Sequence, residues 1–235
     1  MNQDRYDYRN TLGLAGRITP GIKGLIIANV AVFALQTAAR LMGKGDISTI
    51  FGLHPAVAFG DLWLWQPVTY MFLHSPNGLT HILFNMLFLW MFGTEVERAW
   101  GTKAFLRYYF ICGIGGALTT SLLFWDSTTI GASGAVFGVM LAYGMMFPNR
   151  QILFWFLFPM RAISFVLLCI GIEVFSLLSL EDGVAHIAHL GGMFFGYLYM
   201  KRAWQMGPFL KDLRWKFRRR RFKVVDRPDR RYPFH

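Results

Sequence analysis

Long apolar runs alternate with short charged or polar segments along the chain, and this pattern predicts six membrane-spanning helices. An α-helix crosses the hydrocarbon core of a bilayer in about 20 residues, and each run approaches that length. Several of the runs end at charged residues or at a Pro-Asn-Arg stretch. The predicted spans cover residues 24–39, 79–94, 108–125, 130–147, 162–180 and 184–200.

The distribution of Lys and Arg predicts which side of the membrane each connection faces. With six spans, both termini and the connections 95–107 and 148–161 share one side, which holds 22 of the 24 Lys and Arg residues. The opposite side holds only Arg40 and Lys44. Because cytoplasmic segments carry the excess of basic residues, we expect both termini in the cytoplasm.

Composition and charge favour a membrane protein with three parts. Of the 235 residues, 54% are hydrophobic and 16% are charged, whereas soluble domains average about 25% charged. We expect a cytoplasmic N-terminal segment (1–23), an all-α six-span membrane domain (24–202) and a basic cytoplasmic tail (203–235). The tail follows an apolar span directly, so we expect it to bind anionic lipid and not nucleic acid.

The connection between the first two spans, residues 43–78, is rich in Trp, Tyr and Phe. A loop of this length within a compact domain is usually functional. Its aromatic content favours a position in the membrane–water interface, where Trp and Tyr are enriched. A re-entrant or an additional spanning segment is the alternative.

Few polar side chains fall inside the spans, and most of them fall at one depth. Polar groups within a bilayer are candidates for function because burying them there is costly. Spans two, four and six begin on the outer side, and a hydroxyl, an amide and several imidazoles fall in their first turns. Such a layer offers what a nucleophile, its base and oxyanion donors require. The residues are His81, Asn85, Ser133, His186 and His189.

Two further polar residues, Glu173 in span five and Asn29 in span one, do not clearly join this layer. Glu173 falls in mid-span, where we expect it to pair with a neighbouring helix or to line a polar cavity. The layer is therefore expected to lack a carboxylate. A metal site made of His81, His186 and His189 is disfavoured for the same reason, since no acidic residue accompanies them.

Glycines give spans four and six narrow faces. Gly131 and Gly134 flank Ser133, and Gly192 and Gly196 lie one turn apart in span six. Such faces let helix backbones approach closely, which would bring Ser133 toward the histidines of span six. A lone intramembrane Ser or His is more often a packing residue than a catalyst, so the functional interpretation depends on their shared depth.

These motifs resemble those of rhomboid intramembrane serine proteases. The stretch Gly131–Gly134 resembles the nucleophile motif of that family, and His81 with Asn85 resembles its His-x-x-x-Asn motif. His189 precedes glycines at +3 and +7, as the catalytic His does in the last core helix of the family. The resemblance covers about residues 20–202 and implies a six-helix rhomboid-like bundle without a cofactor.

The resemblance also implies a role for each residue. Ser133 becomes the nucleophile and His189 its general base, while His81, Asn85 and the Ser133 backbone N–H form the oxyanion hole. His186, one helical turn before His189, is the alternative base. The implied reaction is cleavage of transmembrane segments of other proteins by a Ser-His dyad without a carboxylate.

Some alternatives stay open at this point. The first loop of the family often has Trp-Arg where this chain has Trp65 and Gln66, so any role of that Arg is in doubt here. A non-catalytic member of the same superfamily typically lacks the Ser or the His, and a transporter needs polar groups across the full membrane thickness. The compact six-span form without a transit-like leader favours a bacterial inner membrane.

Overall fold

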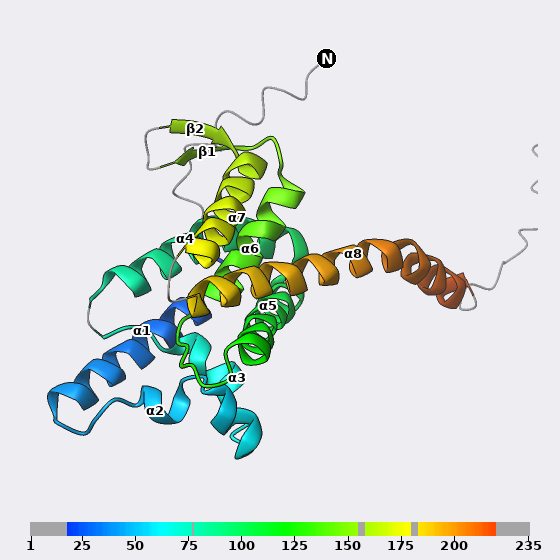
Figure 1. The fold of residues 1–235 in the computed structure, drawn as a ribbon. Coiled ribbons are helices and arrows are strands. Elements are labelled where there is room, and N and C mark those ends of the chain that lie inside the picture. The colour runs from blue at the N-terminus through cyan, green and yellow to red at the C-terminus, as the bar shows by residue number, and fades with distance from the viewer. Residues whose placement is uncertain (1–17, 77, 155–157, 180–182, 220–235) are drawn as a thin grey trace, which may run out of the picture. The chain divides into compact units, whose positions relative to one another are not determined.

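The computed structural model describes residues 18–76, 78–154, 158–179 and 183–219, and most of them lie in helices (Figure 1). The described residues up to Leu198 form one compact unit, and those from Tyr199 onward form a second. The site described below lies wholly in the first unit. The long helices are α1 (Pro20–Leu41), α4 (Thr80–Trp100), α5 (Thr102–Leu123), α6 (Ser133–Met146), α7 (Ala162–Ser179) and α8 (Val184–Arg219).

Each predicted span coincides with one of these helices, but four of the helices, α1, α4, α5 and α8, are longer than predicted. Helix α5 begins at Thr102 instead of residue 108, and α8 continues to Arg219 instead of ending near residue 200. The spans were limited at charged residues, yet Lys and Arg are good helix formers, so the helix continues where the apolar run ends.

Length and composition single out one helix as a membrane span. Within the described residues, α1 is both long and apolar enough to cross a bilayer, and α6 and Ala162–Leu178 of α7 are apolar but shorter. Helix α4 falls outside this group because its apolar run is interrupted by polar groups such as Asn85 and Glu97. Six spanning helices therefore stay a prediction.

The connections contain structure that the hydropathy pattern did not predict. Between α6 and α7, strand β1 (Gln151–Phe154) pairs antiparallel with β2 (Phe158–Arg161), so the fold is mostly helical and not purely so. The guanidinium of Arg150 lies before this hairpin and pairs with Glu95 at 2.9 Å. The first connection contains α2 (Ser48–Phe51), the π-helix η1 (Ala56–Gly60), α3 (Gln66–Thr69) and the 3₁₀-helix η2 (Tyr70–Phe72).

Buried amides tie this first connection together. Gln66 is fully buried, accepts a hydrogen bond from the His54 backbone N–H at 3.0 Å and donates to the Ile50 carbonyl at 3.3 Å. Gln36 of α1 pairs with the backbone N–H and C=O of His74 at 3.0 and 3.1 Å. The neutral amide of Gln66 thus links two parts of this loop, at the position where the resembled family often has Arg.

Helix α6 lies among α4, α5 and α7, and ten of its fourteen residues are buried (Figure 1). Its small face also meets α8, because a Cβ on Gly134 would lie 3.0 Å from the Ala188 carbonyl oxygen and one on Gly192 would overlap the Gly134 backbone. Gly196 differs, since a Cβ there would lie 2.5 Å from the hydroxyl of Tyr108 on α5. Close backbone approach therefore fixes α8 beside the start of α6.

Gly131 lies outside this helix face, contrary to prediction. Helix α6 begins only at Ser133, and Gly131 precedes it with a backbone φ of +130°. Residues other than glycine rarely adopt this conformation. A Cβ at Gly131 would also lie 2.9 Å from Nε2 of His81. Its role is a sharp entry into α6 beside the His81 ring, and not packing between helices.

Candidate functional site

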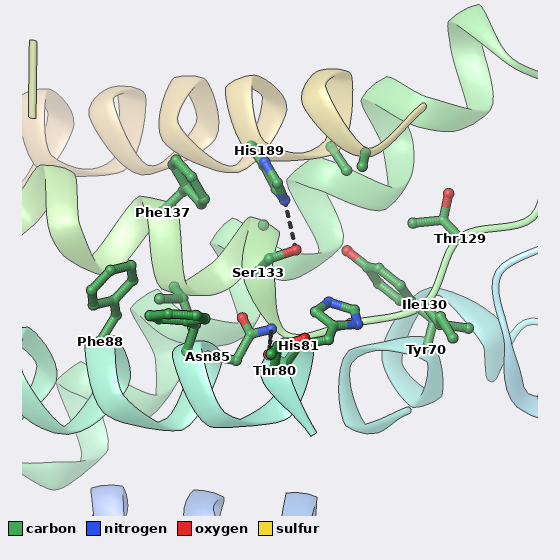
Figure 2. Close-up of a pocket in the computed structure, with 16 residues that line it drawn as sticks. Tyr70, Thr80, His81, Asn85, Phe88, Thr129, Ile130, Ser133, Phe137 and His189 are labelled. Carbon is green, nitrogen blue, oxygen red and sulfur yellow. Dashed lines mark hydrogen bonds between the residues drawn. The ribbon is translucent and has the colours of Figure 1, made fainter. Parts of the chain in front are cut away.

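Ser133 and His189 form a close pair across α6 and α8. Ser133 is the first residue of α6, and the entry loop before it is fixed by a hydrogen bond from the Gly131 N–H to the Tyr70 carbonyl at 2.9 Å. The Ser133 Oγ lies 2.7 Å from Nε2 of His189 (Figure 2). No such contact joins Ser133 to His186 among the described residues, so the geometry distinguishes the two candidate bases.

An aromatic ring fixes the plane of the His189 imidazole. Phe137, one helical turn after Ser133 on α6, stacks on the His189 ring with centroids 4.3 Å apart and planes within 8°. Stacking of this kind restricts rotation of the imidazole about its side-chain bonds. The Nε2 of His189 is thereby held toward the Ser133 hydroxyl.

A carboxylate lies beside the two histidines, which corrects the expectation that the layer lacks one. Glu173 of α7 is 6% exposed, and its Oε2 lies 2.7 Å from Nδ1 of His186 and 3.0 Å from Nδ1 of His189. The expected pairing of Glu173 with a neighbouring helix is confirmed, and its partners are the two imidazoles of α8. The depth of Glu173 was misjudged because this residue lies late in α7, and α8 begins at Val184, soon after α7 ends at Ser179.

The same three side chains offer ligand atoms that lie within 4.8 Å of one another. Zinc accepts both imidazole and carboxylate ligands, but its ligand atoms, bound at about 2.0–2.2 Å, stand about 3.3 Å apart in a tetrahedral site. The 2.7 Å separation of Glu173 from His186 is that of a direct hydrogen-bonded pair. His81, the third member of the disfavoured all-histidine site, is not part of this group.

His81 and Asn85 lie on the other side of Ser133, on one face of α4 (Figure 2). The Nδ1 of His81 accepts a hydrogen bond from the Ser75 backbone N–H at 3.3 Å, so the ring proton resides on Nε2, near Gly131. The Asn85 amide donates one N–H to the His81 carbonyl at 2.9 Å. The second N–H of that amide is a further donor close to Ser133.

A cavity of about 490 Å³ joins these groups. It is mainly apolar, with the Ser133 hydroxyl and the His81, Asn85 and His189 side chains as its main polar groups, as Figure 2 shows. Pockets of this kind, apolar with a few convergent polar groups, are where ligands and substrates bind. The apolar lining includes Phe84, Phe88, Ile130, Val136 and Phe137.

The chain is similar to a known protein family. A family model described as the rhomboid domain matches residues 61–205, which is more than half of the chain and includes every residue of the cavity. The chain belongs to the rhomboid family. Rhomboids are integral membrane proteins, and a bilayer is the environment that a long apolar helix such as α1 requires.

Relatives from plants and bacteria show the extent of the similarity. RHOMBOID-like protein 4 of Arabidopsis thaliana is 32% identical over 134 residues, which are 57% of this chain and 32% of that protein. Rhomboid protease GluP of Bacillus subtilis is 36% identical over 133 residues, 56% of this chain and 25% of its own length. Rhomboid protease AarA of Providencia stuartii is 32% identical over 205 residues, 74% of this chain and 69% of its own length. The chain thus spans less than two thirds of several of its relatives.

The rhomboid domain also contains a fully buried histidine that the sequence did not single out. His74 is fully buried in the first connection, and its ring lies 5.1 Å from that of His81. Burial, with a smaller contribution from His81, lowers the pKa of His74 to about 4, so the ring is neutral at neutral pH. It was missed because residues 43–78 were interpreted as an interfacial loop and not as part of the site.

Proposed function

We propose that this rhomboid is an intramembrane serine endopeptidase that cleaves transmembrane segments of other membrane proteins. The observation that supports it most strongly is the 2.7 Å approach of Ser133 Oγ to His189 Nε2 inside a cavity that His81 and Asn85 also line. A nucleophile, a base within hydrogen-bond reach and a nearby set of donors together define an acyl-transfer site.

The reaction begins with proton transfer from Ser133. A serine hydroxyl is a weak nucleophile until a base accepts its proton, and Nε2 of His189 is placed to do so. The Ser133 oxygen then bonds to the peptide carbonyl carbon, and the C–N bond breaks as His189 gives the proton to the leaving amine. Water, activated by the same imidazole, hydrolyses the acyl ester and frees Ser133.

Three donors stabilise the oxyanion in this proposal. They are the Nε2–H of His81, the amide of Asn85 and the backbone N–H of Ser133. The first N–H groups of a helix lack intrahelical partners, and the positive end of the helix dipole favours negative charge there. Because Ser133 is the first residue of α6, its own N–H has this advantage.

We further propose that six helices span the bilayer, with Ser133 near the outer face, both termini in the cytoplasm and a bacterial inner membrane as the location. Large apolar side chains on the helix surfaces support spanning, because they require a lipid environment. The basic tail would bind anionic lipid on the cytoplasmic side; its side chains lie outside the described residues. The exposed apolar residues include Ile27, Leu35, Leu83, Leu122, Phe175, Leu178 and Phe194.

The substrate must reach the cavity in an unwound form. In a transmembrane helix each peptide bond is hydrogen-bonded and shielded by side chains, so the carbonyl carbon is inaccessible to Ser133. Helix-weakening residues such as Gly or Pro near the cleavage point are therefore expected to accelerate cleavage. The apolar walls around Phe84 and Phe88 suit an extended segment with apolar side chains.

Cleavage in liposomes tests the proposal. Wild type, Ser133→Ala, His189→Ala and His186→Ala are incubated with a panel of single-span substrates, and Ser127→Ala serves as a matched serine control. The Ser127 hydroxyl donates a hydrogen bond to the Phe124 carbonyl oxygen, away from the proposed site. We expect cuts inside the transmembrane segments by wild type and Ser127→Ala, and a loss of at least about 10³-fold in Ser133→Ala and His189→Ala.

Two outcomes contradict parts of the proposal. If folded wild type cuts none of the substrates, the protease assignment fails, and a rhomboid that binds membrane proteins without cutting them becomes the better explanation. If His186→Ala is inactive while His189→Ala remains active, the reaction class stands and His186 is the base.

A further inference from the structure

We propose that Glu173 is a positioning residue that acts through His189, so that the site operates as a Ser133–His189–Glu173 relay and not as a two-residue dyad. This inference rests on the proposed function, since it assigns Glu173 a part in the same reaction. His186 completes the arrangement as a second partner that holds the carboxylate in place.

The position of Glu173 on α7 brings its carboxylate to the far side of the base. Its Oε2 lies 3.0 Å from Nδ1 of His189, the nitrogen opposite the one that faces Ser133. The Ser133 hydroxyl, the imidazole and the carboxylate therefore form a continuous line of polar groups from α6 through α8 to α7. An orienting acid stands in the same relation to the imidazole in soluble serine proteases.

The burial of Glu173 argues against an incidental role. A carboxylate within a bilayer is costly unless it is paired, and an apolar residue on α7 would avoid that cost. The hydrogen-bond and ion-pair partners of Glu173 within the described residues are His186 and His189. A carboxylate placed at this cost against the proposed base is best explained by an effect on that base.

The effect on His189 is first a choice of tautomer. For Nε2 to accept the Ser133 proton, the single ring proton of the neutral imidazole must reside on Nδ1. An ionised carboxylate can only accept hydrogen bonds, so Glu173 beside Nδ1 favours this tautomer over the inactive one. When His189 becomes an imidazolium, the same negative charge stabilises it.

The geometry also sets the size of the effect. The 3.0 Å contact of His189 Nδ1 with Glu173 lacks hydrogen-bond alignment, because Nδ1 makes no hydrogen bond of acceptable angle. The same oxygen is shared with His186 at the shorter distance of 2.7 Å. Loss of the orienting acid lowers kcat about 10⁴-fold in soluble triads. We expect a smaller loss here, about 10- to 100-fold, because the carboxylate is shared and off-axis.

Glu173→Gln tests the inference, since it keeps the shape of the side chain and removes its charge. Cleavage kinetics should show kcat lowered about 10- to 100-fold with KM within about twofold, and Ser133 should react more slowly with a fluorophosphonate by a similar factor. Glu97→Gln, which changes another buried glutamate far from Ser133, serves as the matched control and should leave kcat within about twofold. Thermal unfolding of each variant reports whether it is folded.

A double-mutant comparison separates positioning from general structure. If Glu173 acts through His189, then Glu173→Gln should have no further effect on the residual Ser133 labelling of His189→Ala. Should Glu173→Gln fail to fold, Glu173→Asp gives the same comparison, because it keeps the charge with a shorter reach. Its kcat is expected to lie between those of wild type and His189→Ala.

The outcomes distinguish this inference from the proposed function. If wild type neither cleaves nor labels, the protease proposal itself fails. If wild type both cleaves and labels, two results would overturn the relay alone. One is a kcat of folded Glu173→Gln equal to that of wild type. The other is a slowing of Ser133 labelling by Glu173→Gln that is equal in wild type and in His189→Ala. Inactivation of wild type by a chelator would also overturn the relay, because the cluster would then hold a metal ion.

Discussion

Two buried glutamates, Glu97 and Glu173, occupy different regions of the bundle and differ in the groups that surround them. Glu97, near the end of α4, accepts hydrogen bonds from the Gly21 and Ile22 N–H groups at 2.8 and 2.9 Å. Thr102 donates to it at 2.6 Å, and Thr19 donates as well. Glu97 therefore caps the start of α1 from another helix.

The partners determine what each carboxylate can do. The donors around Glu97 are backbone and hydroxyl groups that keep one charge state at every ordinary pH, so that carboxylate joins α1, α4 and α5 and does no chemistry. The partners of Glu173 are two imidazoles, which can accept and donate protons in a reaction. A buried carboxylate with fixed donors is thus structural, and one that faces titratable groups is a candidate for function.

Outside the Ser133–His189 pair, the largest effect is expected at the proposed oxyanion donors. Asn85→Ala should lower kcat about 10²- to 10³-fold, which is the usual cost of removing one oxyanion donor. Binding of the uncleaved substrate should change little, so the loss appears in kcat and not in KM. Steady-state cleavage kinetics in liposomes measure both, and a loss confined to KM would assign Asn85 to substrate binding instead.

A neutral buried His74 makes stability fall in mild acid. The unfolded chain binds a proton on this imidazole near pH 6.5 and the folded chain only near pH 4, so stability is full above pH 6.5 and is lost as the pH falls from 6.5 to 4. The loss amounts to about 3 kcal/mol over this window. His74→Phe should flatten the stability curve between these values, as thermal unfolding at several pH values would show.

Glu97→Gln should act on stability alone. It replaces an ionised acceptor by an amide and weakens hydrogen bonds to a charged group, at a cost of about 2 kcal/mol, while kcat of the folded fraction stays unchanged. Thermal unfolding and cleavage rates measured on the same preparations give the comparison with Glu173→Gln, for which the reverse pattern is expected. Equal effects of the two variants on kcat would remove the distinction between the two regions.

The contribution of Glu97 to folding stability also depends on pH. Burial raises the pKa of its carboxyl, but the hydrogen bonds from Thr102, Thr19, Gly21 and Ile22 outweigh burial and hold the pKa below its usual value of 4.5. Its contribution to stability is therefore complete above about pH 4.5 and is lost as the pH falls through the lowered value. Glu97→Gln should lose this acid-dependent part of its unfolding curve.

The smallest effect is expected from metal removal. A chelator such as EDTA should leave the cleavage rate within about twofold, because Glu173 and His186 form a direct pair at 2.7 Å. If EDTA abolished cleavage and added zinc restored it, the cluster of Glu173, His186 and His189 would be a metal site.

Helices and site candidates differ in how well the sequence predicted them. Each apolar run became a helix, because a run of that length leaves the backbone few other ways to satisfy its hydrogen bonds. The pairing of Ser133 with one of two histidines followed from their position at the starts of α6 and α8. Hydropathy alone did not separate His186 from His189, which differ by a single helical turn.

What was missed depends on contacts between elements. Glu173 lies six residues before the end of α7, about 9 Å along the helix axis at about 1.5 Å per residue. His186 and His189 lie two and five residues after the start of α8, a comparable depth. Counting from the outer end of span five would have placed Glu173 in the layer. The hairpin before α7 and the burial of His74 leave no periodic signal in the sequence.

In the proposed mechanism, Ser133 is a nucleophile that His189 activates. Mass spectrometry of the folded protein after exposure to a fluorophosphonate tests it most directly, without any assumption about the substrate. We expect one adduct, on Ser133, which is absent from Ser133→Ala and forms far more slowly in His189→Ala. Folded wild type that forms no adduct, or an adduct on another residue that persists in Ser133→Ala, would contradict it.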